Sequence, residues 1–112
     1  MQPEDRVRIL HMLDACNSIA RFVKGRRRED LDSDEMLRFA LVRALEIIGE
    51  AARRVSEQAR QALPTVPWAE MAGMRNRLIH GYFDVNSEIV WRTATVDVPA
   101  LARLLHQLHE SP

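Results

Sequence analysis

Hydrophobic residues recur every three or four positions along most of the chain, the spacing that places side chains on one face of an α-helix. Over residues 4–24 this spacing predicts a first amphipathic helix. Its apolar positions are Ile9, Leu10, Leu13, Cys16, Ala20 and Val23. The charged run at residues 25–30 interrupts the pattern and predicts a loop. No stretch alternates apolar and polar residues with hairpin-turn residues beside it, so we expect no sheet.

A long second helix is predicted to begin at Asp32 and to run to about Leu63. Glu35 follows Asp32 by three residues, which fits a capping box with Asp in place of Ser or Thr. The main apolar stripe is Leu37, Leu41, Leu45, Ile48, Ala52, Val55 and Ala59, and it is widened by Met36, Phe39, Ala40 and Ile47. So wide a stripe predicts a central helix that is buried on two sides, one of which could face a partner subunit.

Two prolines, Pro64 and Pro67, end this helix, and Pro67 precedes a third predicted helix over residues 68–80. Gly81 follows at the position of a C-cap glycine. Asn86 or Ser87 can then cap a fourth helix.

The last predicted segment contains Leu101, Leu104, Leu105 and Leu108. Pro99 either kinks the fourth helix or starts a final one. Together these elements predict an all-α fold, an up-and-down bundle of four to five helices without a sheet. At 112 residues the chain is expected to form a single helical domain over residues 1–112.

Composition says more about the cellular location of the protein than about the reaction that it performs. Sixteen basic residues balance sixteen acidic ones, so the net charge is zero. Zero charge counts against broad, sequence-blind RNA binding but allows a local positive cleft. No apolar run is long enough to span a membrane, the first residues lack the features of a signal peptide, and Cys16 has no partner for an internal disulfide. These features predict a cytoplasmic protein.

Arg75 is the unusual residue of the third helix. On residues 68–80 the apolar face contains Trp68, Met71, Met74, Leu78 and Ile79, and Arg75 falls in its middle, whereas Arg77 and Glu70 point away as ordinary surface. A guanidinium stays charged at any working pH, so among apolar side chains it needs a compensating anion or a cleft. From the residues alone two interpretations are open: a buried arginine paired with a carboxylate, beside a C-capping His80, or a catalytic pair.

A family resemblance favours the catalytic pair. Arg75-x4-His80-x-Tyr82, with Asn76 directly after the arginine, resembles the motif of HEPN-domain ribonucleases, and most closely the small HepT-like toxins that pair with minimal nucleotidyltransferase antitoxins. Residues 43–51, 67–68 and 81–85 resemble the same family in the same order. The resemblance implies a metal-independent endoribonuclease without a cofactor, an all-helical homodimer and a toxin role. It also implies that the nucleotidyltransferase partner silences the toxin by adenylylating Tyr82.

Cleavage of RNA without a metal needs a base for the ribose 2′-OH, an acid for the 5′-oxygen and positive charge for the phosphate. His80 can give or take a proton near neutrality, Arg75 can hold the non-bridging oxygens, and Asn76 could orient the phosphate or the histidine. Five residues on an ideal helix stand about 140° apart. Either the chain turns at Gly81 to bring His80 back, or two subunits share each cleft.

The other candidate residues favour structural roles. His106 and His109 have a spacing that can hold a metal, but without further ligands they are interpreted as surface residues. The arginines at 26–28 precede acidic residues and are interpreted as a solvated loop. Glu46 and Glu50 are interpreted as salt-bridge partners of arginines on their own helix, and Glu46 could instead pair with the motif arginine. An alternative function is a non-catalytic helical module that binds and regulates a nucleotidyltransferase.

Overall fold

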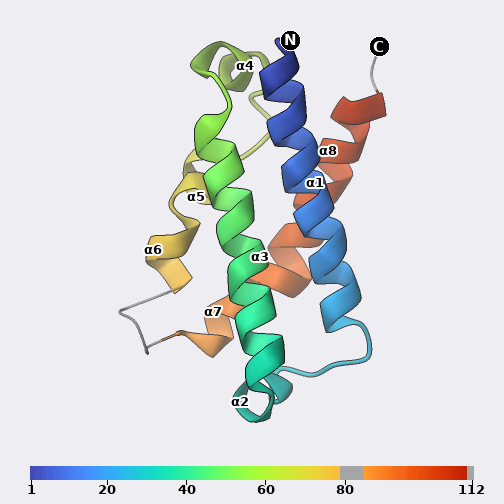
Figure 1. Cartoon of the computed structure of the whole chain (residues 1–112), viewed down its shortest axis with the longest axis vertical. Helices are drawn as coiled ribbons and strands as arrows, with labels where there is room; N and C mark the ends of the chain where they lie inside the picture. Colours follow the sequence, from blue (N-terminus) through green and yellow to red (C-terminus); the bar gives the residue numbers. More distant parts are fainter. Residues whose placement is uncertain (79–84, 111–112) are drawn as a thin grey trace.

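Packed α-helices make up the computed structural model, which describes residues 1–78 and 85–110, except for the side chains of Arg75, His109 and Glu110. Helix α1 (Pro3–Val23) packs lengthwise against α3 (Glu35–Arg54) and against α8 (Val98–Glu110). Figure 1 shows these three long helices side by side, with the shorter helices around them. The described residues form no sheet, which confirms the predicted all-α bundle.

Its core is the predicted stripe of the long helix together with the inner faces of α1 and α8. Every residue of the predicted main stripe, from Leu37 to Ala59, is buried. The residues that widened the stripe behave differently, because Met36 is 83% exposed and Phe39 is 59% exposed. One flank of α3 therefore carries largely exposed apolar side chains, with only the Arg38 guanidinium, 5.6 Å from the ring centre, over Phe39. No helix among residues 1–78 and 85–110 has the length and apolar character needed to cross a bilayer.

The long helix begins and ends elsewhere than predicted. Its N-cap is Asp34, whose Oδ1 accepts from the backbone N–H of Leu37 at 3.1 Å. Asp32 instead lies in the short helix α2 (Asp30–Ser33) and pairs with Arg28. The prediction that Asp32 opens the helix was therefore wrong: Asp34, in extended backbone, holds the capping position.

At its other end α3 stops at Arg54, not at Leu63, and α4 (Glu57–Ala62) follows. Ser56 causes the break. Its Oγ caps α4 by accepting from the Ala59 N–H at 3.1 Å, while its own N–H and O–H both donate to Asp5 of α1 at 2.8 Å. These bonds to a distant helix replace the ones that would have continued α3. The break also lets Val55 and Ala59 both stay buried.

The last helical stretch runs without interruption past Pro99. Helix α7 (Ser87–Arg92) is capped by Asn86, whose Oδ1 accepts from Ile89 N–H at 3.1 Å. A π-helical turn, Thr93–Asp97, then leads directly into α8. Pro99 lies at the second position of α8 and has no N–H to donate to the preceding turn. The chain accommodates it by widening that turn. Of the two predicted alternatives, the structure has Pro99 in the first turn of the last helix, α8, which follows the π-helical turn without a gap.

Candidate active site

Arg75 and Asn76 of the motif lie on a segment that is broken into two short helices over the described residues 68–78, where one continuous helix over 68–80 was predicted. Helix α5 (Trp68–Ala72) ends at Gly73, and α6 (Met74–Leu78) follows. The break comes at a residue with poor helix propensity. It leaves both Met71 and Met74 buried.

A close approach between helices positions this segment. Gly49 of α3 faces α5, and a Cβ added there would lie 2.9 Å from the Met71 carbonyl oxygen and 4.0 Å from the Met74 Cβ. Only a residue without a side chain allows the two backbones to come so near. Gly49 belongs to the stretch 43–51 that resembles the family, so the structure assigns this part of the resemblance a packing role.

Two of the motif residues can be placed in part. The backbone of Arg75 lies on α6, and Asn76 beside it is exposed. The side chain of Arg75, together with all of His80 and Tyr82, lies outside the described residues. The predicted juxtaposition of Arg75 and His80, and the predicted turn at Gly81, therefore stay predictions.

The ends of the stretch that contains His80 and Tyr82 are nevertheless joined. The N–H of Asn86 donates to the carbonyl of Leu78, the last residue of α6, at 3.0 Å. Leu78 is fully buried, and the side chain of Asn86 caps α7. One asparagine thus connects the end of the motif helix to the start of the next.

Acidic residues of α3 lie beside this segment. Glu46 stands three residues before Gly49, which places both on the same face of the helix, and it is half-buried. Glu50 pairs with Arg43 at 3.2 Å on the exposed side. The interpretation of Glu50 as a salt-bridge partner on its own helix is therefore confirmed.

The arginine-rich loop is engaged within the protein. Arg26 donates to Asp34 at 2.7 Å, and this hydrogen bond is the largest of the causes that lower the pKa of the Asp34 carboxyl. Arg28 pairs with Asp32 and also with Glu88 of α7, at 2.6 Å from Nε to Oε1. Of the three arginines predicted to be solvated, Arg27 is exposed, whereas Arg26 and Arg28 are half-buried and held by these contacts. The contacts of Arg28 also connect α2 to α7, the helix that packs against α6.

Thiol and metal-ligand chemistry find little support in the described chain. Cys16 is buried in α1, and desolvation raises the pKa of its thiol to about 12, so it is not a ready nucleophile. Across residues 1–78 and 85–110, with the exceptions named above, no group of His, Cys, Asp or Glu is arranged to hold a metal ion. His106 is exposed, as predicted.

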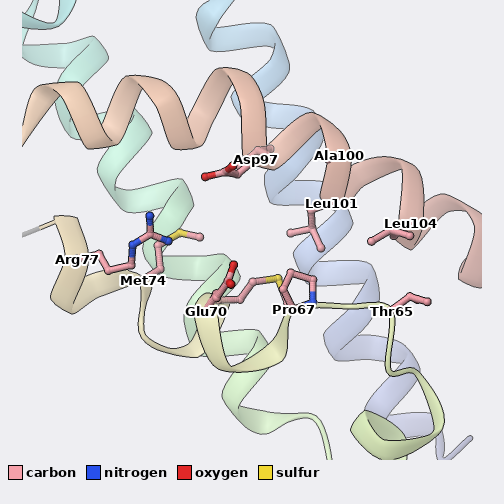
Figure 2. Close-up of a pocket in the computed structure, with 11 residues that line it drawn as sticks. Thr65, Pro67, Glu70, Met74, Arg77, Asp97, Ala100, Leu101 and Leu104 are labelled. Carbon is pink, nitrogen blue, oxygen red and sulfur yellow. The ribbon is translucent and has the colours of Figure 1, made fainter.

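The sequence did not predict a slot that lies on the side of α5 and α6 facing the start of α8. A cavity of about 270 Å³ lies between this segment and the start of α8 (Figure 2). Glu70 and Arg77, interpreted from the sequence as ordinary surface, line it together with Asp97 of the π-helical turn. Glu70 and Arg77 are seven residues apart, a spacing that places them on one face, but nothing in the sequence brings Asp97 to them.

The comparisons with known proteins point in one direction. The family described as Ribonuclease HepT-like matches residues 12–108. A protein of Caldanaerobacter subterraneus subsp. tengcongensis, named "Putative RNase TTE0752", is 42% identical over 98 residues, which are 88% of this chain and 88% of that protein. "Putative RNase MJ1380" of Methanocaldococcus jannaschii is 39% identical over 92 residues, 82% of this chain and 84% of its own. "Probable ribonuclease HepT" of Thermococcus cleftensis is 38% identical over 97 residues, 87% and 88% of the two chains. No solved structure matches the chain.

The match takes in the family-like stretches that the sequence showed. Residues 12–108 include the close-packed α3, the motif helix α6 and the residues from 79 to 84. The identity extends over most of both chains for each of these relatives, so the likeness is not confined to a short motif. The chain therefore belongs to the ribonuclease HepT-like family.

Proposed function

We propose that this chain is a metal-independent endoribonuclease that acts as the toxin of a toxin–antitoxin pair. The observation that carries the proposal is the intact Arg75-Asn76-x3-His80-x-Tyr82 motif in a chain of the ribonuclease HepT-like family. The packing supports it, because Gly49 holds the motif segment against α3 and the Asn86 N–H holds its far end. Such support on both sides is what a site needs if its groups must keep a fixed geometry.

The proposed reaction is attack of the ribose 2′-oxygen on the neighbouring phosphorus. His80 takes the 2′-OH proton, the bond from phosphorus to the 5′-oxygen breaks, and a protonated group returns a proton to that oxygen. The products are a 2′,3′-cyclic phosphate and a 5′-OH. Arg75 stabilises the charge on the phosphoryl oxygens, and Asn76 orients the phosphate.

One histidine cannot be base and acid in the same step, so the proposal includes a homodimer that shares its clefts. Supporting it is the largely exposed flank of α3, which bears Met36 and Phe39. Ile47, two turns further along this flank, is half-buried. Large apolar side chains gathered on one face are typical of a subunit contact. The flank adjoins the face of α3 that carries Gly49, so a partner bound there would lie beside the motif helix.

The proposal also includes the way in which the ribonuclease is silenced. A nucleotidyltransferase antitoxin transfers AMP to the Tyr82 hydroxyl, as the family resemblance implies. Added phosphate next to the cleft repels RNA and competes for Arg75. Mass spectrometry of the chain purified alone and with its co-expressed partner tests this: one or more AMP groups on Tyr82 are expected only in the pair. A partner that silences the RNase while Tyr82 stays unmodified would contradict it.

The main test is incubation of the purified chain with total cellular RNA in EDTA. The parent is expected to cut, and His80→Ala and Arg75→Ala are expected to lose cleavage at least 100-fold, within the range that acid–base and electrostatic groups contribute. His106→Ala and Arg103→Ala replace exposed residues of α8 and serve as matched controls with parental activity. Products that end in a 5′-phosphate would overturn the 2′-oxygen mechanism.

A second candidate function is a non-catalytic module that binds and regulates a nucleotidyltransferase. The zero net charge favours it, because RNA-binding surfaces are usually basic. If the parent with unmodified Tyr82 leaves RNA intact but still binds the nucleotidyltransferase, this second function replaces the first.

A further inference from the structure

The slot beside the motif helix has two different ends. Apolar side chains from both walls form most of it: Pro67, Met71, Met74, Val98, Leu101 and Leu104. Glu70, Arg77 and Asp97 also line it, away from Pro67 and Leu104 (Figure 2). Figure 2 shows the Arg77 guanidinium and the two carboxylates directed into the space between the α5–α6 segment and the helix that carries Asp97.

A second hollow continues from the charged end. It has a volume of about 430 Å³, shares Glu70, Arg77 and Asp97 with the slot, and adds Arg92 and Thr93. The charged end of the slot is therefore the middle of a longer groove. Two guanidinium groups and two carboxylates face it, so its formal charge is balanced.

The four charged side chains of this groove do not stabilise the fold through ion pairs. Among the described residues none of the four forms an ion pair within 4.0 Å, although they line one groove with opposite charges. The arginines of the loop after α1 behave differently, since Arg26 lies 2.7 Å from Asp34. All four side chains are exposed, so their hydrogen-bonding groups are accessible to a ligand that enters the groove.

The backbone at this place is also unusual. Asp97 is the last residue of the π-helical turn Thr93–Asp97, and such turns often mark functional sites. Compared with a regular α-helix, a π turn rotates the residues that follow it. The turn in this chain leaves Asp97 above the slot while Val98 and Leu101 stay buried.

The dimensions limit what the slot can hold. Pockets for drug-sized ligands have volumes of about 300–1,000 Å³, so a cavity of about 270 Å³ accepts roughly one ring system. Apolar side chains on two facing walls suit a flat group. At the polar end, carboxylates accept hydrogen bonds from N–H groups and guanidinium groups donate them. A nucleobase has this combination of apolar faces and a hydrogen-bonding edge.

We propose that the slot binds one unstacked, amine-bearing base of the RNA substrate. Glu70 and Asp97 accept from the exocyclic amine, as acidic side chains do from cytosine N4. Arg77 and Arg92 contact the phosphates on either side of that base. Single-stranded RNA is generally read in this way, with bases out of the stack and hydrogen-bonded at their edges.

The placement of the slot defines which nucleotide it reads. Arg77, which lines the slot, is two residues after the motif arginine on α6, so the slot adjoins the motif helix without including the motif residues. The bound base therefore belongs to a nucleotide beside the scissile one. This inference rests on the proposed ribonuclease function, whose sequence preference it would explain.

Cytidine and uridine 5′-monophosphate form the sharpest pair of probes, because they share one ring and differ in the exocyclic group at C4. The assay is titration of the full-length chain, followed by the methionine methyl signals. Met71 and Met74 line the slot, whereas Met12 is buried in α1 and serves as a reference. We expect cytidine monophosphate to shift the two slot methyls and to bind about fivefold or more tightly than uridine monophosphate, the low end for one good base contact.

A double variant tests the carboxylates. Glu70→Gln with Asp97→Asn keeps the shapes and removes the charge, and the cytidine preference is expected to vanish. Glu4→Gln with Asp14→Asn, both exposed on α1, is the matched control and should keep it. Equal binding of the two nucleotides by the parent, or slot methyls that neither nucleotide moves, would overturn the proposal. Slot methyls that move only with an apolar peptide would also overturn it and would assign the slot to a protein partner.

Failure of this inference can be told apart from failure of the proposed function. A parent that cuts RNA but binds no nucleotide in the slot would remain a ribonuclease with its sequence preference set elsewhere. Cytidine-selective binding by a chain that does not cut RNA would keep the base site and reject the catalytic role.

Discussion

Gly49→Ala is the substitution whose effect can be worked out most directly from the structure. The added Cβ would lie 2.9 Å from the Met71 carbonyl oxygen, about 0.5 Å inside the ordinary contact distance. The obstacle is backbone, so no side-chain rotation relieves it, and α5 must move away from α3. Overpacking of this kind costs about 1–3 kcal/mol.

A gain partly offsets that cost. Alanine is favoured over glycine inside a helix by about 1 kcal/mol, and Gly49 lies within α3. The expected net loss in the free energy of unfolding is therefore about 1 kcal/mol, with an upper limit near 2 kcal/mol. For a chain of this size, a loss of 1 kcal/mol lowers the melting temperature by roughly 4 °C.

Urea unfolding and thermal melting of parent and variant measure this loss. Gly73→Ala is the matched control, because a Cβ there would meet its nearest atom, the Ala69 carbonyl oxygen, at 3.4 Å. That variant should be as stable as the parent or slightly more stable. RNA cleavage by Gly49→Ala should fall more than its folded fraction does, since the displaced segment carries the motif. A Gly49→Ala chain that is as stable as the parent and fully active would refute the close-approach argument.

Three further predictions follow from single contacts. Hydrogen bonds from Ser56, above all the one from its backbone N–H, lower the pKa of Asp5 below 3.8. The carboxylate therefore stabilises the fold above pH 3.8, and this stabilisation is lost as the pH falls through the folded pKa. In urea unfolding between pH 6 and pH 2, Asp5→Asn should lose less stability than the parent, and equal losses would contradict this. Phe39→Glu should convert the proposed dimer to monomer in sedimentation, whereas Val96→Glu, at a side chain 58% exposed on the π-helical turn, should not; a Phe39→Glu dimer would place the interface elsewhere. Asn86→Ala should cost about 1 kcal/mol through loss of the α7 cap, while Asn86→Asp, which can cap equally well, should keep most of the stability in the same unfolding assay.

The parts of the fold that the sequence predicted are those set within single helices. The part of the main stripe that lies in α3, from Leu37 to Ala52, is buried as its spacing required, and Asn86 caps the helix that it was expected to cap. The first helix, expected over residues 4–24, extends over Pro3–Val23. Helical periodicity and side-chain caps act over a few residues, so the local sequence contains the information they need.

The candidate site was predicted in type but not in detail. The motif identified candidate residues and the match shows the ribonuclease HepT-like family, but the roles of these residues stay predictions, and His80 and Tyr82 lie outside the described residues. The slot was not predicted because Glu70 and Arg77 have the spacing of ordinary charged residues on the exposed face of a helix. Asp97 follows Arg77 by 20 residues in the chain, and it lies on a π-helical turn that no local sequence pattern predicted.

The sequence by itself determined that the chain is helical, which faces of its helices are buried, and to which family it belongs. Tertiary structure decided where the helices break and what meets between them. Ser56 ends α3 because Asp5, 51 residues earlier, accepts both its backbone and its side-chain hydrogen bond. The slot exists because α8 packs against α1, and α5 and α6 against α3, which leaves a space between the two segments. Periodicity describes one helix at a time, whereas breaks and cavities depend on how helices that are distant in sequence pack against each other.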